Sequence, residues 1–124
     1  MLWHCSLFTF KPETSEATIA AIAQEFRALG RKLAYVRSVS VARSASDFSI
    51  IKGIAEARGV KHLEPGYELV ALLGFDRIED YYRYCDDEDH WTLVRQFLLP
   101  NQRARASIQF ELPDGASAGS ASLL

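Results

Sequence analysis

Cysteine is scarce in this chain of 124 residues, and the two cysteines, Cys5 and Cys85, lie far apart. Neither belongs to a CxxC spacing or to a set of cysteines and histidines spaced as zinc ligands. Their arrangement excludes a disulfide framework and argues against a structural zinc site. We therefore expect two reduced thiols and a cytoplasmic location.

An excess of one charge is also missing. Lysine and arginine number 14 against 16 aspartates and glutamates, which gives a net charge of −2. Nucleic-acid binders depend on basic side chains that neutralise phosphates, so we expect no nucleic-acid partner. No apolar run approaches the roughly 20 residues that span a bilayer, and the first residues do not resemble a signal peptide. We expect no membrane partner either.

The chain does contain enough apolar residues, 48%, to build the core of one ordinary domain. Alternating and β-branched residues predict strands over residues 2–10, 34–43, 67–75 and 103–112. Apolar residues at helical spacing predict helices over 15–29 and 46–58, and a third helical stretch from residue 76 to Pro100. We assign the domain to residues 1–112. The Gly/Ala/Ser-rich segment 113–124 is expected to be a disordered tail.

Short polar signals mark the predicted helix boundaries. Ser15 is a capping residue for the first helix, and Gly30 is a stop signal. Asp76 and Glu79 form a D-x-x-E capping box ahead of the third helical stretch. Asp87 is expected to cap a restart within that stretch.

The order β-α-β-(α)-β-α-β predicts an α+β fold of the ferredoxin-like, split βαβ type, with a four-stranded antiparallel sheet and two principal helices on one face. Strands 2–10 and 67–75 are apolar on both faces, although the helices cover only one. In the last strand we expect an inward set, Ala104, Ala106, Ile108, Phe110 and Leu112, and an outward set, Arg103, Arg105, Gln109 and Glu111. The uncovered sheet face needs a cover, and a second copy of the chain is the simplest one.

The stretch YCDDEDHW, residues 84–91, places four consecutive acids between Tyr84 and His90. Calcium loops distribute their ligands at alternate positions around a glycine turn and add a distant glutamate, and that spacing is not present. The acids therefore predict a solvated helix start and no metal site. The helix dipole favours neutral His90 and the nearby carboxylates favour its cation, and the sequence leaves the balance open.

Three stretches of the chain are similar to one protein family. LWHCSLFTFK (2–11) resembles a first strand that typically reads IKHIVLFKLK, and GYELVALLGFD (66–76) resembles GYDLALVVEFD. YCDDEDHWTLVRQFL (84–98) resembles YLAHPAHQAFVEEFL without gaps. These are the patterns of the Dabb, or stress-responsive α/β-barrel, domain family, and the resemblance extends over residues 2–112 in the order of elements.

The resemblance implies a homodimer in which two sheets face each other as an α+β barrel. It also implies similarity to polyketide cyclases of the olivetolic acid cyclase type, which close a linear polyketide thioester by aldol condensation without a metal or an organic cofactor. By position, His90 would be the catalytic base and Tyr84 its catalytic partner, with His4 near the same pocket. The other pocket residues that we predict are Phe8, Leu69, Tyr81 and Trp91.

The chain also departs from the family pattern. Asp87 stands where the family usually has its first histidine, Glu88 where it has proline, and Leu69 where the plant cyclase has a further pocket histidine. The segment 44–65 is longer than the usual connection. We predict that this segment is a lid that bounds the cavity, excludes water and selects the substrate.

We therefore predict a cofactor-free acid/base enzyme that acts on a β-keto or polyketide-like small molecule in an apolar pocket. Two alternatives stay open: a non-catalytic stress-responsive or ligand-binding barrel, and a cofactor-independent monooxygenase. Arg103 and Arg105 are expected in solvent, or at a pocket mouth that receives a carboxylate or thioester-bearing substrate.

Each candidate side chain also has an ordinary structural explanation. His90 fits a helix-start residue, Tyr84 a core aromatic residue with its hydroxyl at the rim, and His4 a core histidine with satisfied hydrogen bonds. Cys85 fits a buried, inert thiol, because no histidine and orienting acid accompany it at a recognisable spacing.

Overall fold

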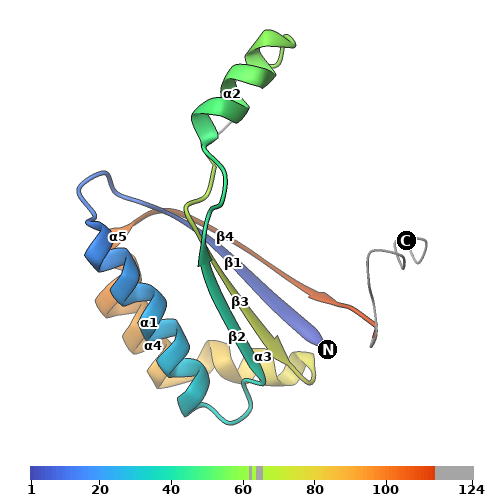
Figure 1. Cartoon of the computed structure of the whole chain (residues 1–124). Helices are drawn as coiled ribbons and strands as arrows, with labels where there is room; N and C mark the ends of the chain where they lie inside the picture. Colours follow the sequence, from blue (N-terminus) through green and yellow to red (C-terminus); the bar gives the residue numbers. More distant parts are fainter. Residues whose placement is uncertain (62, 64–65, 114–124) are drawn as a thin grey trace.

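The sheet is the centre of the fold in the computed structural model, which describes residues 1–61, 63 and 66–113. Its strands are β1 (Leu2–Phe10), β2 (Ser38–Arg43), β3 (Leu69–Phe75) and β4 (Gln102–Glu111), in the order β2-β3-β1-β4. All neighbouring strands are antiparallel, and helices cover one face (Figure 1). The predicted ferredoxin-like α+β fold is confirmed. Of the expected tail, 113–124, residues 114–124 lie outside the described residues.

The helical elements are α1 (Glu16–Lys32), α2 (Phe48–Ala57), α3 (Ile78–Asp86), α4 (Glu88–Leu93), the π-helical turn η1 (Val94–Leu98) and α5 (Leu99–Asn101). Helices α1 and α4 lie against the same face of the sheet (Figure 1). Within the described residues, no helix combines the length and the apolar character needed to cross a membrane.

Helix α1 begins as predicted but ends later. The Ser15 side chain accepts a hydrogen bond from the backbone N–H of Thr18 at 3.1 Å, which caps the first turn. The predicted stop at Gly30 is wrong, because the helix continues to Lys32. A β-carbon at Gly30 would collide with the side chain of Val39 on β2. Gly30 therefore permits the close approach of α1 to the sheet.

Several other predicted boundaries shift. Strands β2 and β3 begin at Ser38 and Leu69, later than predicted. A turn that joins the N–H of Val36 to the carbonyl of Leu33 at 3.0 Å precedes β2 and delays its start. The predicted capping box is wrong: α3 begins without a side-chain cap, and Asp76 instead pairs with Arg37 at 3.7 Å.

The helical stretch after Asp87 also ends later than predicted. It continues past Pro100 to Asn101, through the π-helical turn and the short helix α5. Pro100 lies in the first turn of α5, a position that does not require a backbone N–H.

The two faces of the sheet differ in what covers them. On β1, His4, Ser6 and Phe8 are buried on the helix-covered face, whereas Trp3, Cys5 and Leu7 alternate with them and are only half-buried. The register pairs Cys5 with Ile108 and Leu7 with Ala106, so these apolar residues share the open face.

The orientation that we predicted for β4 is therefore reversed with respect to the helices. Arg105 pairs with Phe8 and Gln109 with His4, which places the polar set on the helix-covered face. The apolar set, with Ile108 61% exposed, lies on the open face. The polar residues of β4 thus face the helices but stay largely exposed, and the space between β4 and the helices holds a cavity.

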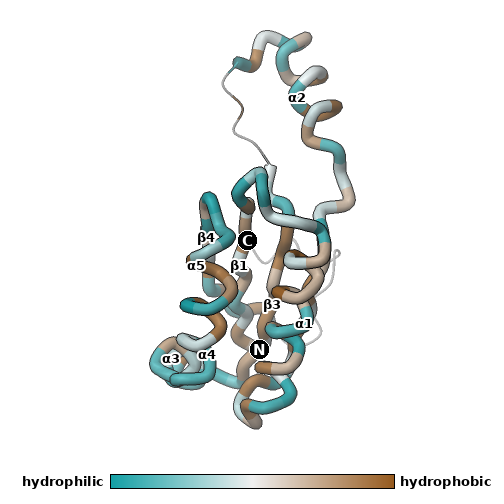
Figure 2. Tube along the Cα trace, turned by 90° about the vertical axis from the view of Figure 1, so that its left-hand side faces the viewer, coloured by the Kyte–Doolittle hydropathy of each residue, from teal (hydrophilic) through white to brown (hydrophobic). Residues whose placement is uncertain are grey.

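Helix α2 stands away from the rest of the domain (Figure 1). Asp47 caps it by accepting a hydrogen bond from the N–H of Ser49 at 2.9 Å, yet none of its residues is buried. Its isoleucines, Ile50, Ile51 and Ile54, are exposed, and Figure 2 shows hydrophobic segments along this isolated helix. The predicted helix over 46–58 is confirmed with slightly shorter bounds.

Candidate active-site cavity

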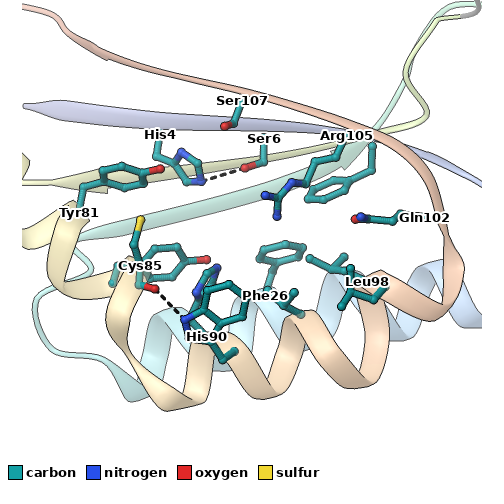
Figure 3. Close-up of a pocket in the computed structure, with 15 residues that line it drawn as sticks. His4, Ser6, Phe26, Tyr81, Cys85, His90, Leu98, Gln102, Arg105 and Ser107 are labelled. Carbon is teal, nitrogen blue, oxygen red and sulfur yellow. Dashed lines mark hydrogen bonds between the residues drawn. The ribbon is translucent and has the colours of Figure 1, made fainter.

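A cavity of about 300 Å³ lies between the helix-covered face of the sheet and the helices (Figure 3). This volume is at the lower end of the range for small-molecule sites. The sheet side contributes His4, Ser6, Phe8, Gln102, Arg105 and Ser107. The helical side contributes Phe26, Tyr81, Tyr84, Cys85, His90, Trp91, Val94, Leu98 and Leu99.

Most of the predicted site residues come together around this cavity. The two predicted catalytic residues, Tyr84 and His90, line it together with His4, Phe8, Tyr81 and Trp91. Leu69 does not: it is 2% exposed and packs in the core, so its assignment to the pocket is wrong. No described residue of the segment 44–65 lines the cavity either, because α2 extends away from it, so the predicted lid is not a wall of this cavity.

A break between α3 and α4 brings Tyr84 and His90 together. Asp87 has an extended backbone, ends α3 and caps α4 by accepting a hydrogen bond from the N–H of Asp89 at 2.9 Å. The indole N–H of Trp91 donates to the carbonyl of Cys85 at 2.9 Å and joins the two helices. The rings of Tyr84 and His90 then lie 4.3 Å apart between centroids. The predicted helix restart at Asp87 is confirmed.

The acids that surround the break mainly hold the helices in place. The second carboxylate oxygen of Asp87 accepts a hydrogen bond from the hydroxyl of Tyr35 at 2.8 Å. Asp89 pairs with Lys32 at 2.9 Å, and Glu88 pairs with Arg95 at 2.8 Å. Among the described residues, no cluster of three or more histidine, cysteine or acidic side chains has the geometry to hold a metal ion.

Burial and the nearby charges together favour the neutral form of His90. Burial lowers the pKa of His90 and the charge of Arg105 lowers it further, while Asp87 opposes these effects. The Nδ1 atom is buried and makes no hydrogen bond to any described residue. Neutral His90 therefore has a buried ring nitrogen that no described residue engages, and a neutral imidazole is the form that can accept a proton. The effect of the neighbouring acids, which the sequence left open, is the weaker one.

His4 is held by two neighbours on the sheet. The side-chain amide of Gln109 donates to its Nδ1 at 2.9 Å, so Nε2 carries the ring proton and donates to the Ser6 hydroxyl at 2.8 Å. Burial, aided by the charges of His90 and Arg105, lowers the pKa of His4 from 6.5 to about 4. His4 is thus neutral near pH 7, and the hydroxyl proton of Ser6 is left free to donate into the cavity.

Tyr84 remains protonated over the physiological range. It is 1% exposed, and burial raises the pKa of its hydroxyl. No hydrogen bond from this hydroxyl to another described residue is present. Tyr84 is therefore a hydrogen-bond donor placed beside His90 on the helical side of the cavity.

The family of the chain follows from its sequence. The model of the Dabb family, the Stress Responsive A/B Barrel Domain, matches residues 2–112. The chain belongs to the Dabb family. Among curated proteins, none matches this sequence.

Solved structures show the same fold at low sequence identity. The Arabidopsis thaliana protein At3g17210 has a TM-score of 0.72 and 17% identity, over 94% of this chain and 99% of that one. Hydroxynitrile lyase from Passiflora edulis has a TM-score of 0.70 and 9% identity, over 94% and 96%. A dimeric ferredoxin-like protein of unknown function from Thermobifida fusca has a TM-score of 0.67 and 14% identity, over 90% of each chain. These identities support the fold alone.

The cavity of this Dabb chain includes polar residues that the sequence did not single out or placed in solvent. Ser6 was one member of an apolar strand, Gln102 lay outside the predicted strand, and Arg105 was assigned to the polar, outward face. The signal for all three was the alternation of β4 and its pairing with β1. Figure 3 shows Ser6 and Arg105 pointing from the sheet toward the helices, opposite His90 and Phe26.

Proposed function

We propose that the protein is a cofactor-free acid/base enzyme that removes a proton from the carbon next to a carbonyl group. The observation that carries this proposal is the pairing of neutral His90 with protonated Tyr84, 4.3 Å apart between ring centroids, at one cavity wall. One residue of this pair can accept a proton and the other can donate a hydrogen bond. A base forms the enolate, and a hydrogen-bond donor stabilises the negative charge that develops on its oxygen.

The proposed step assigns one role to each side chain. The neutral imidazole of His90 takes the proton from the substrate carbon, and the electron pair of the broken C–H bond moves to the carbonyl oxygen. The Tyr84 hydroxyl donates a hydrogen bond to that oxygen as its negative charge develops. The enolate carbon can then attack a second carbonyl in the same molecule. The proton held by His90 returns to the resulting alkoxide, which completes an aldol closure.

The walls of the cavity support a substrate of modest size with both apolar and polar parts. Phe8, Phe26 and Leu98 provide apolar surface, and the Ser6 hydroxyl provides a donor on the opposite wall. A β-keto or polyketide-like molecule combines these properties with an acidic C–H group. The description of one structural relative as a hydroxynitrile lyase supports the proposal that this fold can hold lyase chemistry.

We propose further that the protein is a homodimer whose two open sheet faces form the barrel. Trp3, Leu7 and Ile108 lie on this face, where the described part of the chain supplies no covering helix. Exposed apolar patches of this kind mark association surfaces. A relative with the same fold is described as dimeric, which supports the same arrangement here.

Proton exchange is the direct test of the chemistry. With 3-oxooctanoate in D₂O, NMR measures how fast the protons between the two carbonyl groups are replaced by deuterium, relative to buffer. We expect the protein to accelerate this exchange and His90→Ala to reduce the acceleration by about 10²- to 10⁴-fold. Imidazole added to His90→Ala should restore part of the rate, because it can occupy the space of the missing ring.

Matched tyrosine variants separate the role of Tyr84 from packing. Tyr84→Phe should lose most of the acceleration, whereas Tyr82→Phe, at an exposed position outside the cavity, should keep it. Wild-type protein that does not accelerate exchange would exclude the acid/base assignment and favour a non-catalytic barrel. Oxygen consumption with a polycyclic aromatic substrate would instead indicate a monooxygenase.

A further inference from the structure

Arg105 is the one permanently charged residue among the described residues that line the cavity. None of the described residues that line it is an aspartate or a glutamate. Both histidines are held in their neutral forms near pH 7, partly by the charge of Arg105 itself. The cavity therefore has a net positive charge, and the residues that line it supply no compensating anion.

The guanidinium is directed into the cavity by the register of the sheet. Arg105 pairs with Phe8, a buried residue of the helix-covered face, so both side chains point toward the helices. Figure 3 shows the Arg105 side chain extending from β4 into the space above Phe26 and His90. The charge thus lies on the wall opposite the proposed base.

Other arginines of the domain contrast with Arg105. Arg37, Arg43, Arg77 and Arg95 each pair with a carboxylate of the chain. The side chain of Arg105 makes no ion pair or hydrogen bond with any described residue. Its five N–H donors are therefore available to a ligand.

A second unsatisfied group lies at the same end of the cavity. The Oε1 atom of Gln102 is buried and has no hydrogen-bond partner among the described residues. Figure 3 shows Gln102 beside Arg105, close to the junction of α5 and β4. Buried polar atoms are normally paired, so this end of the cavity is suited to a polar ligand group.

We propose that Arg105 binds the carboxylate of the substrate, so that the site takes a β-keto carboxylic acid in preference to its neutral ester or thioester. The assignment of this ligand as a substrate rests on the proposed function. The planar guanidinium matches a carboxylate with two parallel hydrogen bonds. A phosphate dianion fits less well, because one arginine supplies a single positive charge and the remaining walls are neutral at pH 7.

This arrangement also defines how the substrate lies. With its carboxylate on the sheet side at Arg105, the chain of a β-keto acid extends across the cavity toward the helical wall. The acidic carbon next to the carboxylate then faces His90, and the ketone oxygen is directed toward Tyr84. Arg105 is thus a binding residue that selects the substrate and orients it for proton removal.

Binding of a matched pair of probes tests this proposal without requiring turnover. Titration calorimetry at neutral pH and low salt compares 3-oxooctanoate with its methyl ester, using the full chain. We expect the acid to bind at least about tenfold more tightly than the ester, as charge-assisted hydrogen bonds to arginine allow. Arg105→Met should remove this preference, and Arg105→Lys, which keeps the charge without the planar fork, should retain part of it.

Arg103→Met is the matched control, since it removes the same charge from the same strand at a position that does not line the cavity. It should keep the full preference for the acid. Circular dichroism confirms that each variant is folded. Equal affinities for acid and ester, a preference that survives in Arg105→Met, or failure of both probes to bind would overturn the proposal.

Proton exchange measured on the same samples separates this proposal from the proposed function. Selective binding of the acid that depends on Arg105, without accelerated exchange, would support the carboxylate site and exclude the acid/base chemistry. Accelerated exchange, with acid and ester bound equally well, would support the acid/base chemistry and exclude the carboxylate site. Selective binding should also persist in His90→Ala, because holding the carboxylate requires no proton transfer.

Discussion

Helices α1 and α2 carry the same local signals and have opposite environments. Each begins at a capping side chain, Ser15 or Asp47, and each has apolar residues at helical spacing. Five apolar residues of α1 are buried, namely Ile19, Ile22, Ala23, Phe26 and Leu29. None of α2 is buried. A cap and a hydrophobic stripe therefore predict that a helix forms, but not that it packs against its own domain.

The difference arises from where the chain carries each helix. Helix α1 returns across the sheet and packs on β2, with Gly30 against Val39. Helix α2 follows the edge strand β2 and leaves the sheet after Ser44, whose N–H donates to the carbonyl of Glu68 at 2.9 Å. Its isoleucines and the open sheet face are thus two apolar surfaces that the described part of the chain leaves uncovered.

The largest effect is expected from a charge on the open sheet face. Ile108→Glu should weaken the proposed dimer by at least about a thousandfold, because an unpaired carboxylate buried in an interface costs several kcal/mol. Light scattering and sedimentation over a range of protein concentrations measure this change. A wild-type monomer at micromolar concentration, or an unchanged dimer in Ile108→Glu, would contradict the barrel arrangement.

Ile54→Glu is the comparison that tells the two apolar surfaces apart. The exposed fractions of Ile54 and Ile108 are similar, at 57% and 61%, so the two substitutions place a charge at equally accessible positions. If the sheet face alone forms the dimer, Ile54→Glu leaves the association constant within experimental error. A comparable loss in Ile54→Glu would show that α2 belongs to the interface.

The next largest effect is a pH dependence that we expect for the stability of the domain but not for that of α2. The pKa of His4 is lowered to about 4 in the folded protein, so the unfolded chain binds a proton between pH 6.5 and 4 that the folded chain does not. The contribution is complete above pH 6.5, and the free energy of unfolding should fall by about 3 kcal/mol as the pH decreases to 4. Urea unfolding at several pH values measures this slope, and His90 adds to it in the same direction.

His4→Gln provides the control for this slope, because glutamine does not titrate. The variant should show a shallower dependence between pH 6.5 and 4, and an unchanged slope would contradict the assignment. The cap of α2 should respond only at lower pH, since hydrogen bonds from Ser49 lower the pKa of Asp47 below its usual value. The protection factors of the α2 amides, which compare each exchange rate with that of an unfolded peptide at the same pH, should therefore stay constant while the domain weakens.

The strands and helices were predictable because their signals are local. Alternation in β1 and β4, the cap at Ser15 and the restart at Asp87 each involve a few neighbouring residues. Boundaries were less accurate where a tertiary contact overrides a local preference. By itself Gly30 is a stop signal, but α1 continues through it to Lys32. The glycine is explained by the close contact of this position with Val39.

The cavity was predictable only in part. Tyr84 and His90 were found through the register of one family stretch, and both line the cavity. Arg105 was predicted in solvent or at a pocket mouth, and it is an exposed residue that lines the cavity. Alternation shows which residues share a face but not which face the helices cover. In a sheet whose open face is apolar, the polar set of the last strand faces the helices, so it marks the cavity.

The smallest effects come from one substitution made in both helices. Gly30→Ala should lower the free energy of unfolding by about 1–2 kcal/mol, because the collision with Val39 outweighs the gain in helix propensity. Gly53→Ala should instead stabilise α2 by up to about 1 kcal/mol. No atom lies within 4 Å of a β-carbon at Gly53. Urea unfolding measures the first change, and slower hydrogen exchange of the α2 amides measures the second.

Val39→Ala tests the cause of the first change, since it removes the methyl groups that a β-carbon at Gly30 would meet. In the double variant, the cost of Gly30→Ala should largely disappear relative to Val39→Ala alone. Destabilisation of α2 by Gly53→Ala would show that α2 packs closely against another surface, and the second copy of the chain would then be the first place to look. A glycine-to-alanine change should therefore destabilise the buried helix α1 and stabilise the exposed helix α2.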